Sequence, residues 1–90
     1  MKKRKIDILL DYIDKGDKEN SIKLVSTFNK GVSPQEMEII QIASECYKGK
    51  SEFYKSLGYD IDDYKDKAWI AIIRNYEWQL IKRNGQTDNP

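Results

Sequence analysis

Five glycines divide the chain into stretches whose apolar residues recur at helical spacing: Gly16, Gly31, Gly49, Gly58 and Gly85. Glycine adopts the left-handed conformation at a helix C-terminus without steric cost. A glycine just after a periodic apolar run is therefore a signal for the end of a helix. No stretch shows a strand-like alternation of useful length, so the pattern predicts an all-α protein.

The segments between these glycines predict a compact bundle of four to five helices with a long C-terminal helix. In the first segment, Ile6, Leu9 and Ile13 fall on one face of a helix. We assign residues 1–85 to a single helical domain and residues 86–90 to a disordered tail. The expected helices cover approximately residues 3–15, 17–30, 33–48, 51–57 and 60–83.

The starts of three helices are marked by residues that cap helix N-termini. Ser33 precedes Pro34 and is followed three residues later by Glu36, which is the pattern of a capping box. Asp17 and Asp60 stand where the second and the last helix need an N-cap. These local signals predict where each helix begins.

The inward face of each expected helix supplies the candidate core residues. The third helix has the widest apolar arc, including Cys46, and we expect it to lie at the centre of the bundle. Cys46 is then a buried small apolar residue rather than a reactive thiol. The short fourth helix is expected to contribute Phe53, Tyr54 and Leu57 to the packing.

Composition bounds the class of protein and its compartment. The 90 residues include 16 basic and 15 acidic side chains, so no broad electrostatic field favours nucleic acid or an anionic membrane. Asp7, Asp11 and Asp14 interrupt the apolar run that a signal peptide would need, and no stretch is long enough to span a membrane. With a single cysteine, no intramolecular disulfide can form. We expect a cytoplasmic protein.

The sequence also argues against catalytic and metal-binding chemistry. It has no histidine, which removes the commonest general base and the commonest metal ligand. The one dense carboxylate cluster lacks the glycine and the twelfth-position glutamate of a calcium loop, because Ala71 stands at that twelfth position. We interpret the cluster as helix-capping and first-turn residues, and we predict no enzyme activity, cofactor or metal. Its members are Asp60, Asp62, Asp63 and Asp66.

One segment suggests a DNA-binding alternative. Residues 32–43 (VSPQEMEIIQIA) resemble the opening helix of helix-turn-helix domains of the response-regulator and sigma-factor type, and residues 50–58 resemble the short middle helix and its turn. The resemblance implies a transcription regulator whose next helix enters the major groove. That helix begins with acidic residues, whereas recognition helices usually present basic or polar ones, so this function ranks second. Its phosphate contacts would come from Lys48, Lys50 and Lys55, together with the basic N-terminus.

The leading hypothesis concerns the last helix. Trp78 lies about 180° around that helix from Trp69, off the apolar stripe, so it either packs under the N-terminal helices or anchors an interface. With Tyr59 and Arg74 it forms the candidate partner-binding set. We predict a small non-enzymatic protein–protein interaction module, acting as a regulator, inhibitor or adaptor. Its partner is another protein, and a homodimer contact is an open alternative.

Overall fold

The computed structural model describes residues 4–28 and 31–85, and within these ranges all regular structure is helical. The all-α prediction is therefore confirmed, including the long C-terminal helix. The predicted tail at 86–90 lies outside the described residues. The elements are α1 (Lys5–Asp14), α2 (Lys18–Val25), α3 (Pro34–Glu45), the connection η1 (Cys46–Lys50), which is kinked at Gly49, α4 (Ser51–Ser56) and α5 (Ile61–Gly85).

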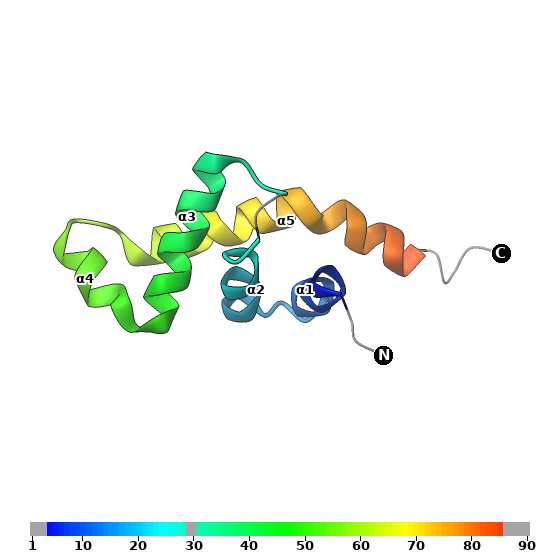
Figure 1. The fold of residues 1–90 in the computed structure, drawn as a ribbon, viewed down its shortest axis with the longest axis horizontal. Coiled ribbons are helices and arrows are strands. Elements are labelled where there is room, and N and C mark those ends of the chain that lie inside the picture. The colour runs from blue at the N-terminus through cyan, green and yellow to red at the C-terminus, as the bar shows by residue number, and fades with distance from the viewer. Residues whose placement is uncertain (1–3, 29–30, 86–90) are drawn as a thin grey trace.

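The longest helix, α5, organises the molecule (Figure 1). It contains 25 residues, about 37 Å at 1.5 Å per residue. Helix α3 crosses α5 and shares its largest contact with it, while α1 and α2 pack against each other beside them. Helix α4 lies at the end of the molecule remote from α1.

The predicted N-caps form as expected. The Ser33 hydroxyl accepts from the Glu36 N–H at 3.2 Å, and the Glu36 carboxylate accepts from the Ser33 N–H at 3.1 Å. Asp17 accepts from the Asn20 N–H at 3.2 Å, and Asp60 accepts from the Asp63 N–H at 3.2 Å. Each bond satisfies a backbone donor that the helix itself leaves unpaired.

Helix α2 is shorter than the predicted range of 17–30, because it ends at Val25. The Ser26 and Thr27 hydroxyls donate to the carbonyls of Lys23 and Leu24, each at 2.7 Å. Such side-chain donors compete with the continuing helix for its last carbonyl groups. The turn over 26–28 is closed by backbone bonds from Thr27 to Leu24 and from Phe28 to Val25.

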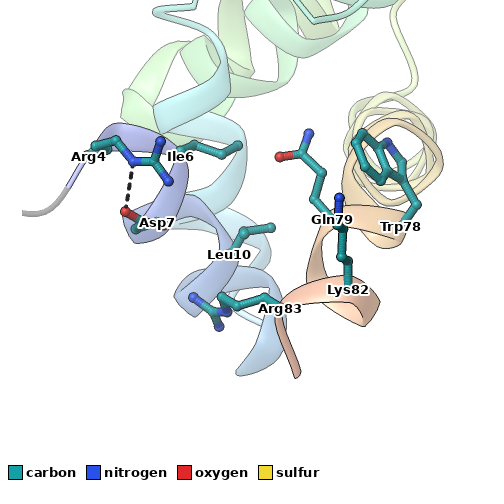
Figure 2. A pocket seen from close by; sticks show the side chains of 8 residues that line it. All are labelled: Arg4, Ile6, Asp7, Leu10, Trp78, Gln79, Lys82 and Arg83. Carbon is teal, nitrogen blue, oxygen red and sulfur yellow. Dashed lines mark hydrogen bonds and ion pairs between the residues drawn. The ribbon is translucent and has the colours of Figure 1, made fainter. Parts of the chain in front are cut away.

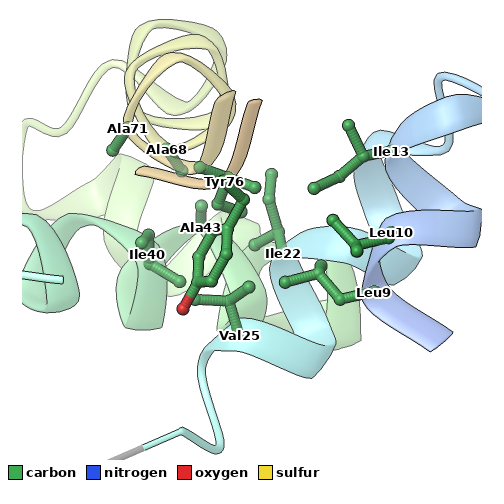
Figure 3. Close-up of a cluster of buried hydrophobic side chains, with 11 residues drawn as sticks. Leu9, Leu10, Ile13, Ile22, Val25, Ile40, Ala43, Ala68, Ala71 and Tyr76 are labelled. Atoms are coloured by element: carbon green, nitrogen blue, oxygen red, sulfur yellow. The ribbon is translucent and has the colours of Figure 1, made fainter. Parts of the chain in front are cut away.

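The core is built from four helices, α1, α2, α3 and α5 (Figure 3). Its fully enclosed centre includes Leu9, Ile22, Ile40 and Ile72. Cys46 is also buried, as predicted. The complete cluster of buried apolar residues is Leu9, Leu10, Ile13, Ile22, Val25, Ile40, Ala43, Ala68, Ala71, Ile72 and Tyr76.

Helix α4 contributes no buried residue, which corrects the expectation that it adds to the core. Phe53 and Leu57 are each 58% exposed. The helix is only 6 residues long and follows a kink at Gly49, whose φ is 108°. Its contact with α5 is the smallest of the main helix contacts, so little of α5 is available to cover its apolar side chains.

Candidate protein-interaction surface

Helix α5 has apolar side chains on both of its long faces. The inner face carries Ala68, Ile72 and Tyr76, which are buried. The opposite face carries three large apolar residues that remain exposed: Ile70 at 55%, Trp78 at 59% and Ile81 at 64%. Large apolar side chains gathered on one exposed helix face commonly mark an interaction site. We call the set Ile70, Arg74, Glu77, Trp78 and Ile81 the outer face of α5.

Trp78 lies at the edge of a hollow between α1 and the C-terminal part of α5 (Figure 2). The hollow has a volume of about 320 Å³. The α1 side presents Arg4, Ile6, Asp7 and Leu10, and the α5 side presents Trp78, Gln79, Lys82 and Arg83. Because Trp78 is more than half exposed, it is not a core residue covered by the N-terminal helices.

An ion pair joins the two helices beside this hollow. The guanidinium of Arg83 donates to the carboxylate of Asp11 at 3.1 Å, and both side chains are about two-thirds shielded from solvent. The pair fixes the C-terminal part of α5 against α1. Trp78 therefore lies on a part of α5 that is joined to α1 by this ion pair.

Arg74 lies one helical turn before Trp78 and is exposed on the same face. A second shallow hollow brings it near Glu36 and Ile39 of α3. The neighbouring Asn75 amide donates to the Ala71 carbonyl at 2.7 Å and to the Glu36 carboxylate at 3.3 Å. Of the predicted partner-binding set, Arg74 and Trp78 therefore lie close together on the exposed side of α5.

Tyr59 is separated from the other two residues of the predicted set. It precedes α5, and the separation of 17 positions between Ile61 and Trp78 corresponds to about 25 Å along the helix axis. Its ring stacks between those of Tyr54 and Tyr64, with centroid distances of 5.4 and 5.1 Å. Tyr59 thus helps to attach α4 to α5 and lies far from Trp78.

Phe53 and Leu57 form an exposed apolar pair on α4, which the sequence pattern did not predict. Both were assigned to the core because they share a helical face. The available signal was the length of the segment, since a helix of two turns between glycines buries little surface. Phe53 makes an edge-on contact with Tyr54, with ring centroids 5.3 Å apart.

The three lysines of the DNA-binding alternative are exposed but stand among acidic neighbours. The Lys50 ammonium lies 3.7 Å from the Glu45 carboxylate. Lys55 borders a hollow that also contains Asp60 and Asp62. Lys48 borders a different hollow, next to Glu45. These neighbours offset the positive charge that phosphate contacts would need.

Hydrogen bonding and burial shift the pKa values of three groups in the described helices. Burial raises the pKa of the Cys46 thiol, which keeps it in the less reactive protonated form. Hydrogen bonds from Asn20 lower the pKa of the Asp17 carboxyl at its N-cap position. Hydrogen bonding to Asp63 raises the pKa of Lys67, whose ammonium lies 3.0 Å from that carboxylate.

The described ranges 4–28 and 31–85 contain no group of three or more side chains placed to hold a metal ion. In the same part of the chain, no helix combines the length and apolar character that crossing a bilayer requires. No known protein family, curated protein or solved structure matches the chain.

Proposed function

We propose that this protein is a non-enzymatic helical module that binds another protein through the outer face of α5. A regulator, inhibitor or adaptor would work in this way. The observation that carries the proposal is the exposure of Ile70, Trp78 and Ile81 on one face of a helix whose opposite face joins the buried core. The single cysteine agrees with a cytoplasmic location for such a module.

A partner that covers this face would remove its apolar surface from water. Apolar surface gains about 25 cal/mol per Å² on burial, and tryptophan and arginine are enriched among the residues that dominate binding energy. Trp78 and Arg74 supply both residue types within one helical turn. The surrounding backbone is a long helix packed on its inner face, so little ordering entropy opposes binding.

The test compares Trp78→Ala with Phe53→Ala. Both changes remove an exposed aromatic side chain, the first from the outer face of α5 and the second from α4. Each variant is immobilised beside the unchanged chain, a native lysate is passed over it, and bound proteins are identified by mass spectrometry. Far-UV circular dichroism checks that both variants fold.

We expect a protein from the lysate to bind the unchanged chain and the Phe53→Ala variant but not the Trp78→Ala variant. Because apolar burial drives this contact, retention should persist in high salt. Equal capture by all three chains would contradict the proposal. Binding to duplex DNA that falls steeply with salt and with Lys50→Gln would favour the helix-turn-helix alternative instead.

A further inference from the structure

We propose that the partner for the outer face of α5 is a second copy of the same chain, bound in antiparallel orientation. The inference rests on the proposed function, since it names the occupant of the same surface. Four residues form the line of contact: Ile70, Arg74, Glu77 and Ile81. Their spacing of four, three and four residues is the spacing of the a and d positions that form the contact line between paired helices.

The order of these residues is self-complementary. The midpoint of the line lies between Asn75 and Tyr76. When two such helices run antiparallel about a two-fold axis at this midpoint, Ile70 of one copy faces Ile81 of the other. In the same register Arg74 faces Glu77. A two-fold interface requires that each residue and its counterpart exchange places in this way.

Charge complementarity selects the antiparallel orientation. Arg74 and Glu77 are both exposed, and neither makes an ion pair within 4.0 Å among the described residues; the charge of Arg74 also acts at longer range on the Glu36 carboxylate and lowers its pKa. In the antiparallel pair each arginine meets a glutamate, twice over the interface. In a parallel pair Arg74 would face Arg74 and Glu77 would face Glu77, and like charges placed opposite each other disfavour association.

Apolar groups surround these central charges. The two isoleucine pairs lie at the ends of the line, and Trp78 lies beside it, one turn after Arg74. Burying these side chains gives the contact its apolar area, and the charges set its register. The line spans about three helical turns, so the interface falls at the small end of specific contacts. We expect a dimer that dissociates in the micromolar range.

Charge exchange between the two central positions tests the pairing. Arg74→Glu places two glutamates on each copy, and Glu77→Arg places two arginines there. Each variant alone should dissociate at least about tenfold more readily than the unchanged chain, because both central pairs become repulsive. Sedimentation equilibrium from micromolar to millimolar protein measures the dissociation constant. Circular dichroism verifies that the monomers keep their helix content.

Mixing the two single variants is the decisive measurement. Glutamates from one copy then meet arginines from the other at both central positions, so the mixture should dimerise nearly as well as the unchanged chain. The double variant Arg74→Glu/Glu77→Arg should do the same by itself. Glu52→Arg makes the same change as Glu77→Arg on exposed α4 and should leave the dimer unaffected.

Two outcomes would overturn self-pairing: an unchanged chain that stays monomeric over the whole range, or a mixture that associates no better than its components. Neither outcome removes the proposed function. That proposal is decided separately by whether Trp78→Ala loses a different captured protein that Phe53→Ala retains.

Discussion

Gly31 occupies a position where the backbone and the packing both require the absence of a side chain. Its φ is 102°, and a Cβ built there would collide with the hydroxyl of Tyr76. We predict that Gly31→Ala lowers the free energy of unfolding by about 2–4 kcal/mol, from left-handed backbone strain together with overpacking. Urea denaturation followed by circular dichroism measures the change.

Gly16 provides the matched control, because it has a φ of 70° but no atom within 4 Å of its added Cβ. Gly16→Ala should lower the free energy of unfolding by the backbone strain alone, about 1–2 kcal/mol. Adding Tyr76→Phe to Gly31→Ala removes the hydroxyl that the Cβ meets and should recover part of the loss. Equal costs at the two glycines would show that the Tyr76 contact adds no strain.

For individual residues, the sequence predicted the features that depend on residues close by in the chain. The caps at Asp17, Ser33 and Asp60 form because each bond joins residues three apart. The position of Trp78 off the apolar stripe was also readable. Its exposure was not, because that depends on where α1 packs against α5, which no local pattern specifies.

The capping box of α3 gives that helix a dependence on pH. The Ser33 N–H, donating to the Glu36 carboxylate, holds the pKa of this carboxyl below its ordinary value. The ionised Glu36 carboxylate therefore stabilises the folded chain fully above the ordinary glutamate pKa, and this stabilisation is lost as the pH falls through the lowered pKa. We predict that Glu36→Gln is less stable than the unchanged chain near neutral pH. The difference should shrink in acid.

Urea denaturation of both chains between about pH 7 and about pH 3 measures this difference. Glu38 is an exposed carboxylate in the same helix and makes none of the described side-chain hydrogen bonds. Glu38→Gln should therefore change the neutral-pH stability less than Glu36→Gln does. A Glu36→Gln difference that stays constant into acid would exclude the capping carboxylate as its source.

Element boundaries were less predictable than element types. The end of α2 at Val25 depends on hydroxyl donors at Ser26 and Thr27, which the periodic apolar pattern does not reveal. The prediction that the apolar residues of α4 are buried was wrong for another reason. Phe53 and Leu57 share a helical face, but burial also needs an opposing surface, and α4 lies at the end of the molecule where little covers it.

The molecule as a whole divides into a packed body of α1, α2, α3 and α5 and a peripheral α4. The packed body shares one buried cluster, whereas α4 places no residue in it. Among the contacts that attach α4 is the ring stacking of Tyr54, Tyr59 and Tyr64. A single cluster across four helices should make them unfold cooperatively.

Ile72 provides the test of this cooperativity, because it is fully buried at the centre of the cluster. Ile72→Ala should lower the free energy of unfolding by about 2–5 kcal/mol, whereas Leu57→Ala on exposed α4 should change it by less than about 0.5 kcal/mol. In a Trp78→Phe background, Trp69 fluorescence reports on the packed body, since Trp69 packs against the cluster. Hydrogen exchange should then show faster opening across α1, α2, α3 and α5 in Ile72→Ala, with α4 amides already fast in the unchanged chain. Comparable losses for the two variants would mean that α4 belongs to the same cooperative unit as the body.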